Sequence, residues 1–312
     1  MIRPFKALIQ KLQLKTTQLF QTAEKPKPTN ELSPRERHKD FGICRLLEID
    51  GASYELRGDS YLANMPHDYE PALCKLLKIA SSIAGEGVAM DVGANIGATA
   101  ILLSKHWPEV LAFEASPRTS KILKDNIASN HINNIRIFDC GLGKRDEQLP
   151  ITAAQNNASG GFLSPAIQHL DGHITEIASI RNGDSFLDEQ QINQRIALIK
   201  IDVEGHELEA LSGLTRRLEQ DKPIIILEMN HWCLNAFKRC SIPDFLDQLQ
   251  AITPHILAFD DGSENAVIIG GKNSSATYHV MHEHIVNNKY PTLLLASNPV
   301  ALKTIVNALA KN

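Results

Sequence analysis

The sequence lacks three features that would each define a class of protein. No run of apolar residues is long enough to cross a bilayer, and no Cys-x-x-Cys pair marks a zinc or dithiol site. A large excess of one charge is also missing, because 32 basic and 36 acidic residues give a formal net charge of -4. These absences disfavour a membrane-spanning protein, a zinc-ribbon protein and a protein that binds nucleic acid through a basic surface.

Cysteine is scarce and scattered along the chain. The five cysteines are odd in number and widely spaced, which indicates reduced thiols. The N-terminus shows no compact apolar stretch of the secretory kind, so we expect a cytoplasmic protein. With 312 residues, the chain is long enough for one large α/β domain with additions at its ends.

Residues 1–20 carry four basic residues and no acid. Their apolar residues follow helical spacing, namely Phe5, Leu8, Ile9 and Leu12. The pattern predicts a basic amphipathic helix that contacts a membrane surface or a partner, or else docks on its own domain. Proline and charge dominate from Lys25 to Asp40, which indicates a linker. The expected division is 1–42 arm and linker, 43–84 lead-in segment, 85–272 core and 273–312 C-terminal extension.

Short β-rich runs alternate with helical patterns in the core. The expected strands are 88–92, 110–114, 135–139, 196–202 and 223–228, and the expected helices are 71–84, 98–105, 119–128 and 207–218. This alternation predicts a doubly wound α/β fold with a mostly parallel, Rossmann-like sheet. The stretch 151–194 breaks the rhythm and is interpreted as an irregular insertion or cap. Closing strands are expected at 255–259 and 266–269, and a final helix from Pro299 to Ala310 with Asn298 as its cap.

The first core strand ends in a glycine loop, residues 91–97. Gly93 and Gly97 allow a tight turn before the helix, while Asp91 and Asn95 offer polar groups. The Gly-x-x-x-Gly spacing differs from the Gly-x-Gly-x-x-Gly loop that holds a pyrophosphate. The loop therefore suits a ligand without phosphate, such as S-adenosylmethionine.

The next two strands also end in polar residues. Glu114 lies some twenty residues past the loop, where a carboxylate can accept hydrogen bonds from both ribose hydroxyls. The alternative is a helix-capping role beside Ser116. Asp139 and Cys140 close the third strand, where an adenine would lie; a turn aspartate and a packing thiol are the alternative interpretation.

The fourth strand ends in an unusually charged segment, Lys200 to Glu207. Asp202 and Glu204 are candidates to orient an acceptor or accept its proton, and His206 is an alternative base. Glu204 and Glu207 could instead serve the N-terminus of the following helix. Glu228 and His231, at the end of the fifth strand, are candidates of second rank.

A histidine-rich stretch near the C-terminus does not predict a metal site. The spacing of His279, His282 and His284 matches neither a helical i, i+4 pair nor a known zinc pattern. We therefore predict no metal ligand.

The ordered set of motifs resembles the FkbM family of methyltransferases. The resemblance rests on Asp91 to Gly97, Phe113 to Pro117, Asn126 to Asn130, Lys200 to Gly213 and Pro223 to Glu228. It implies a class I methyltransferase that uses S-adenosylmethionine and usually methylates a hydroxyl of a sugar, glycan or polyketide-like metabolite. Two positions depart from the family pattern, since Gly183 replaces a common leucine and Ala115 a common proline.

Under this interpretation, Gly93, Gly97 and Glu114 hold the cofactor, and Asp202, Glu204 or His206 positions and deprotonates the acceptor hydroxyl. Two other functions remain open. One is a non-catalytic cofactor-binding or scaffold protein. The other is a nicotinamide-dependent oxidoreductase, disfavoured by the missing second glycine of the pyrophosphate loop.

Overall fold

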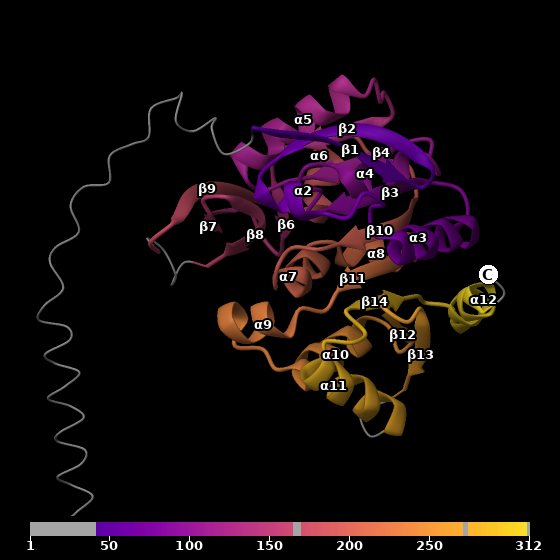
Figure 1. The fold of residues 1–312 in the computed structure, drawn as a ribbon. Coiled ribbons are helices and arrows are strands. Elements are labelled where there is room, and N and C mark those ends of the chain that lie inside the picture. The colour runs from indigo at the N-terminus through magenta and orange to yellow at the C-terminus, as the bar shows by residue number, and fades with distance from the viewer. Residues whose placement is uncertain (1–41, 165–169, 271–273, 311–312) are drawn as a thin grey trace, which may run out of the picture. The chain divides into compact units, whose positions relative to one another are not determined.

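The computed structural model describes residues 42–164, 170–270 and 274–310. Their centre is an eight-stranded sheet with the order β13-β12-β14-β11-β10-β3-β4-β5 (Figure 1). Its strands are β3 (Val88–Val92), β4 (Val110–Phe113), β5 (Ile135–Phe138), β10 (Ile196–Ile201), β11 (Ile224–Glu228), β12 (Ile256–Asp260), β13 (Asn265–Ile269) and β14 (Thr292–Leu295). The predicted arm and linker lie outside the described residues.

The five strands from β5 to β11 in the sheet run parallel. They coincide with the five predicted core strands to within one or two residues, which confirms the doubly wound α/β fold. β12 and β13 form the expected closing antiparallel pair. The final helix α12 (Pro299–Leu309) begins as predicted, because the Asn298 side chain accepts a hydrogen bond from the Val300 amide.

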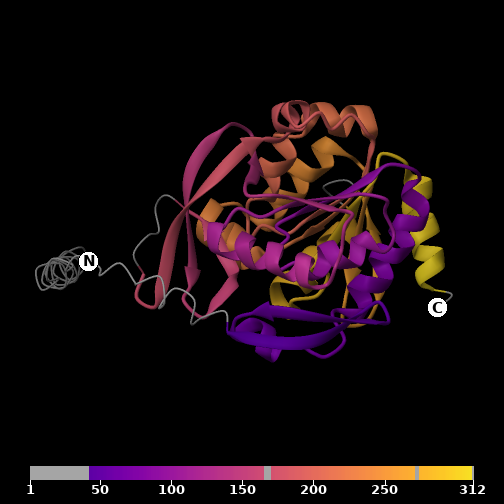
Figure 2. The same cartoon turned by 90° about the horizontal axis from the view of Figure 1, so that it is seen from above.

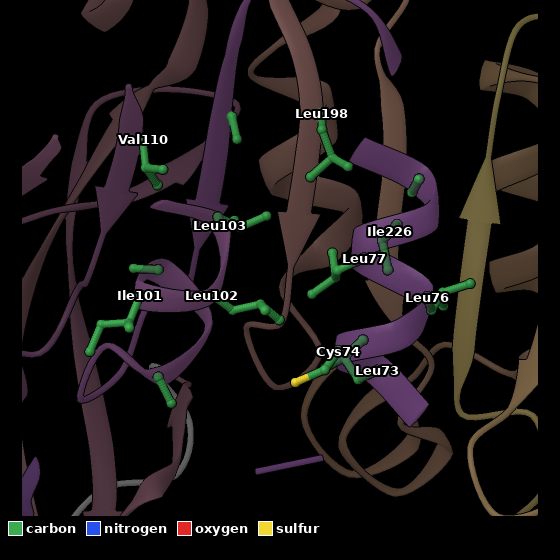
Figure 3. Close-up of a cluster of buried hydrophobic side chains, with 14 of the residues drawn as sticks. Leu73, Cys74, Leu76, Leu77, Ile101, Leu102, Leu103, Val110, Leu198 and Ile226 are labelled. Carbon is green, nitrogen blue, oxygen red and sulfur yellow. The ribbon is translucent and has the colours of Figure 1, made fainter. Parts of the chain in front are cut away.

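Helices cover both faces of the sheet. Side chains alternate between the faces, so that Ala89 belongs to one buried cluster and its neighbour Met90 to the other. One cluster includes residues of α3 (Pro71–Ala84), α4 (Ala98–Ser104), α5 (Pro117–Ser129) and α12. In Figure 3, α3 and α4 project leucine and isoleucine side chains toward Val110, Leu198 and Ile226 of the strands. The opposite cluster includes residues of α6 (Gly183–Glu189), α7 (Glu207–Ser212), α10 (Ile242–Ile252) and α11 (Ser275–Asn287).

The lead-in segment forms a hairpin that the sequence analysis did not predict. β1 (Ile43–Ile49) pairs with β2 (Ala52–Gly58), followed by the short helix α2 (Ser60–Asn64). Asp50 and Gly51 both have positive φ, 47° and 73°, as a two-residue type I′ turn requires. This Asp-Gly dipeptide is a signal from which the hairpin could have been found.

The stretch 151–194, interpreted as an irregular insertion or cap, is not irregular. It contains most of a second sheet, seen on the left in Figure 2, and the strand order of this sheet is β6-β9-β7-β8. Its strands are β6 (Gly141–Gly143), β7 (Glu147–Ala154), β8 (Asn157–Leu163) and β9 (His173–Asn182). Few of their residues are fully buried, so they lack the continuous apolar runs of the core strands. Polar residues and Gly160-Gly161 inside β8 gave the stretch the composition of a loop.

The segment 273–312 contributes to the main sheet. β14 was not predicted, and it pairs antiparallel with both β11 and β12, so it lies between them. The remaining elements are α8 (Thr215–Asp221), α9 (His231–Cys233) and the π-helical turn η1 (Leu234–Lys238). Among the described residues, no helix has the length and apolar composition needed to span a membrane.

The position of β14 gives a test of how far the C-terminal segment belongs to the core. Leu294 is fully buried between two strands. We expect Leu294→Ala to lower the free energy of unfolding by about 2–5 kcal/mol, because it leaves a cavity in the core. Chemical denaturation measures this change. Val300→Ala is the control, since Val300 is 62% exposed on α12 and this substitution should change the free energy of unfolding by less than about 0.5 kcal/mol. Equal effects of the two substitutions would contradict the placement of β14 in the core.

Candidate active site

The order of the strands fixes where a ligand can bind. From β3 the chain winds outward through β4 and β5, and it then returns to β10 on the other side of β3. Such a reversal opens a crevice at the carboxyl ends of the two strands that flank it. The glycine loop follows β3 and the charged segment follows β10, so both predicted groups of residues lie at this crevice.

The glycine loop packs directly against the end of β10. Gly93 has φ +86°, and a Cβ atom there would lie 1.9 Å from the carbonyl oxygen of Asp202. A residue larger than glycine therefore cannot occupy this position without moving β10. Gly97, with φ +104°, donates a hydrogen bond to the Ala94 carbonyl and precedes α4. The tight turn of the glycine loop and its close approach to the backbone of β10 therefore agree with the role predicted for the two glycines.

Glu114 lies beside the loop and is buried. Its carboxylate accepts hydrogen bonds from the backbone amides of Asn95 and Ser116, both at 2.8 Å. Burial raises the pKa of Glu114 to about 7, against the effect of these two amides. Ser116 itself caps α5, so the capping role belongs to the serine and not to Glu114.

Lys200 connects the ends of β3 and β10. Its ammonium lies 3.1 Å from an oxygen of Asp202 and 3.9 Å from an oxygen of Asp91. Burial would lower the pKa of Lys200, but the two carboxylates outweigh it and raise this pKa. Asp91 is completely buried, burial raises its pKa to about 6, and neither carboxylate oxygen accepts a hydrogen bond from a described residue. Asp91 therefore lies beneath the loop, against Lys200.

The carboxyl groups of Asp202 and Glu228 share a hydrogen bond. Burial would raise the pKa of Asp202, but Lys200 outweighs it and holds this pKa below its ordinary value. The negative charge of Asp202, together with burial, holds the pKa of Glu228 well above its ordinary value. Asp202 is thus the ionised member and Glu228 the protonated one.

Glu204 is held by one of its two oxygens. Asn230 Nδ2 and Cys233 Sγ both donate to Oε2, at 3.1 and 3.0 Å. These two bonds leave Oε1 available to an incoming group. Burial raises the pKa of Glu204, with Asp202 adding to the effect. A carboxylate with a raised pKa is a stronger base than an exposed one.

His206 is buried and has a defined protonation state. Lys238 Nζ lies 2.8 Å from Nδ1, and an ammonium can only donate, so Nδ1 accepts and Nε2 carries the proton. Burial and the Lys238 charge lower the pKa of His206 to about 4. The neutral ring therefore presents an N–H group, which makes it a donor and argues against the predicted alternative role as a base.

Three other predicted residues lie away from this arrangement. Glu207 accepts hydrogen bonds from the Val203 and Gly205 amides at the start of α7, as the helix-terminus interpretation expects. Asp139 is exposed and binds Ser120 and Lys124, and Cys140 is a buried thiol. The cavity described next is lined instead by their neighbours Gly141 and Leu142.

Two cavities meet at this edge of the sheet. The glycine-loop cavity, about 820 Å³ together with the open solvent at its mouth, is bordered by Gly93, Asn95, Glu114, Asp202, Glu204 and His206. The acidic cavity, about 1250 Å³ on the same basis, has five carboxyl groups in its wall: Glu70, Asp202, Glu204, Glu228 and Asp261. Asn95, Asp202 and Glu204 border both cavities. A ligand in one cavity would therefore lie next to a ligand in the other.

Several residues of the two walls were not found from the sequence. The second sheet contributes Ile151, Leu163 and Glu176 to the glycine-loop cavity, and Glu176 accepts a hydrogen bond from the Ser116 hydroxyl. Glu70 and Tyr61 come from the lead-in segment. These residues lie far in sequence from the motifs, and only the strand-like alternation of β7 and β9 could have indicated a sheet there.

Among the described residues, no three histidine, cysteine or acidic side chains converge in a way that could hold a metal ion. His279 packs against Tyr290, and His284 packs against His231. The predicted second-rank residue His231 is therefore part of a histidine pair.

Comparison with known protein families agrees with this arrangement. The family model described as the Methyltransferase FkbM domain matches residues 91–279, more than half of the chain. The chain belongs to the FkbM methyltransferase family. This membership agrees with the resemblance drawn from the glycine loop, Glu114 and the segment after β10.

Three curated relatives of this FkbM chain are also methyltransferases. Methyltransferase 1 of Beauveria bassiana is 27% identical over 142 residues, covering 40% of this chain and 57% of that protein. Methyltransferase sdnD of Sordaria araneosa is 28% identical over 153 residues, covering 40% and 59%. The hexuronic acid methyltransferase AglP of Haloferax volcanii is 29% identical over 141 residues, covering 45% and 55%. The chain thus spans little more than half the length of these relatives.

A solved structure of a methyltransferase FkbM from Methylobacillus flagellatus is 16% identical, with a TM-score of 0.41, covering 67% of this chain and 43% of that one. A putative O-methyltransferase from Klebsiella pneumoniae is 11% identical, with a TM-score of 0.42, covering 76% and 86%.

The protonation state of His206 can be measured directly. Lys238→Met removes the neighbouring charge that helps to lower the pKa of His206, so we expect this pKa to rise from about 4 toward its ordinary value. NMR titration of the imidazole C–H resonances follows the change. Lys124→Met, which removes an exposed lysine beside Asp139, should leave His206 unaffected. If Lys238→Met also left the pKa of His206 unchanged, the assignment of His206 as a hydrogen-bond donor would be wrong.

Proposed function

We propose that this protein transfers the methyl group of S-adenosylmethionine to a hydroxyl oxygen of a sugar, glycan or polyketide-like metabolite. The observation that carries the proposal is the junction of the two cavities at Asn95, Asp202 and Glu204. One cavity suits the cofactor, and the other offers room for an acceptor beside it. The names of the relatives support methyl transfer, and one of them supports a sugar acceptor.

The chemistry of the glycine-loop cavity fits the cofactor. Glu114 offers a buried carboxylate, and each of its oxygens has a further lone pair for a ribose hydroxyl. Phe113, Leu142 and Ile151 supply apolar wall for an adenine ring. Asp202 and Glu204 place negative charge near the loop, which favours a ligand that carries a positive sulfonium. Gly93, Asn95 and Glu114 would therefore hold the cofactor.

When bound, S-adenosylmethionine supplies an activated methyl group and its own leaving group. The protein then has to position the acceptor oxygen in line with the methyl group and take up the hydroxyl proton. Glu204 suits the second task, because Oε1 is available, the pKa is raised and the side chain borders both cavities. Asp202, held ionised by Lys200, suits the task of orienting the acceptor hydroxyl.

Cofactor binding tests the first half of the proposal. The free protein holds Glu114 with a pKa of about 7, and ribose hydroxyls donate to its ionised form. Ionisation of Glu114 should therefore favour binding, so affinity for S-adenosylmethionine should rise as the pH increases through about 7 and level off above it. Calorimetric titration at several pH values measures this dependence.

The matched variant for this test is Glu114→Gln, which should weaken binding and remove this part of the pH dependence. A reduced nicotinamide cofactor serves as the control ligand. Binding of the nicotinamide instead of S-adenosylmethionine would favour an oxidoreductase. Binding of neither by folded protein would favour a scaffold.

The base can be tested separately from the cofactor site. We expect Glu204→Gln to reduce methyl transfer by about 10²–10⁴-fold while the protein still binds S-adenosylmethionine. The measurement is release of S-adenosylhomocysteine with a mixture of methyl glycosides as probe acceptors. Because the base must be ionised, the native rate should rise with pH through the raised pKa of Glu204, and the variant should lose this limb.

Glu189→Gln is the matched control for this substitution, since it removes the same charge from α6, outside both cavities. It should leave the rate unchanged. A native rate in Glu204→Gln would exclude Glu204 as the base and leave Asp202 as the candidate.

A further inference from the structure

Acidic side chains dominate the wall of the acidic cavity. Its wall contains five carboxyl groups, from Glu70 on the segment before α3, Asp202 and Glu204 after β10, Glu228 at the end of β11, and Asp261 after β12. Among the described residues of this wall, Lys200 is the one cation. Its ammonium is already paired with Asp202 and Asp91. The cavity therefore offers no free cation to a negatively charged ligand.

The carboxyl groups are arranged to accept hydrogen bonds. An ionised carboxylate can only accept hydrogen bonds, so the ionised acids of the wall are satisfied by ligand groups that donate. The Thr292 hydroxyl is shared between the two oxygens of Asp261, at 3.2 and 3.3 Å, and Glu204 keeps Oε1 available. Asn157 and Asn288, which also border the cavity, are neutral. A ligand rich in hydroxyl or ammonium groups matches this wall, whereas a carboxylate or phosphate would be repelled.

Burial strengthens this selection at Asp261. This side chain is half-buried, and burial raises its pKa to about 6. Its carboxylate is therefore less well solvated than that of an exposed acid and gains more from a donor, whereas Glu70 is exposed and adds a further acceptor to the wall. Because Asp202 and Glu204 belong to both cavities, the donor-rich ligand would lie next to the cofactor site.

We propose that the acidic cavity selects an acceptor that is rich in hydroxyl or amino groups and carries no negative charge, and that it discriminates against uronates and phosphorylated sugars. The inference rests on the proposed function, because it names the acceptor class of the same site. The acids that impose the selection beyond the reacting centre are Glu70 and Asp261, which come from opposite ends of the described chain.

The test uses sets of three methyl glycosides that differ only at C6, which carries a hydroxyl, an amine or a carboxylate. The gluco, galacto and manno configurations give three such sets. The full chain is first saturated with S-adenosylhomocysteine, and each glycoside is then titrated by calorimetry. We expect the neutral or the amino member to bind at least about tenfold more tightly than the uronate in every set that binds.

A uronate that bound as tightly as its neutral partner would overturn the inference. So would the absence of binding by all nine glycosides to protein that binds S-adenosylhomocysteine normally. Failure of the protein to bind S-adenosylhomocysteine is a different result and would count against the proposed function. The two failures are therefore separated by the first titration.

A double variant tests whether the named acids impose the selection. Glu70→Gln with Asp261→Asn removes two charges from the wall and leaves Asp202 and Glu204 in place. We expect it to bind S-adenosylhomocysteine normally and to reduce the discrimination against uronates by about tenfold. Glu86→Gln is the matched control, because Glu86 is exposed and lies before β3, whereas the glycine loop and the cavities lie at the other end of this strand. Unchanged discrimination in the double variant would contradict the assignment.

Discussion

The buried ion pair of Lys200 is the interaction on which the rest of the site depends. Its ammonium lies between carboxylates from two neighbouring parallel strands, Asp91 on β3 and Asp202 after β10. Loss of Lys200 would leave the fully buried Asp91 without a compensating charge, and breaking a buried ion pair in this way typically costs about 3–5 kcal/mol. The ion pair keeps Asp202 ionised, and ionised Asp202 in turn keeps Glu228 protonated. One lysine therefore sets the charge of the wall between the two cavities.

The sequence predicted correctly those elements whose structure depends mainly on their own residues. The strands that are buried on both faces read as continuous apolar runs, so β3, β10 and β11 were predicted almost to the residue. The glycine loop and Glu114 were also placed together, and the hydrogen bond from the Asn95 amide to Glu114 joins them. The glycine loop and Glu114 are separated by one helix and one strand, α4 and β4, so the number of residues between them varies little.

Prediction failed where burial depends on distant partners. β14 lies outside the segments that carry the motifs, and its burial depends on β11 and β12, which enclose it. Strands β7 to β9 carry few fully buried residues and therefore looked like a loop. In the site, Lys238 decides the protonation state of His206, and no sequence pattern links the two.

The acidic wall raises a question about catalysis that Lys200 answers. In the proposed reaction, transfer of a methyl group would neutralise the sulfonium of S-adenosylmethionine, so negative charge near that sulfonium would stabilise the reactant more than the transition state. A wall of uncompensated carboxylates would therefore bind S-adenosylmethionine tightly and slow the reaction. Pairing Asp202 with Lys200 removes part of this field where the two cavities meet, while Glu204 keeps an oxygen available for the proton. Glu70 and Asp261 border the acidic cavity and not the glycine-loop cavity, so under the proposed function they would select the acceptor without holding back the methyl group.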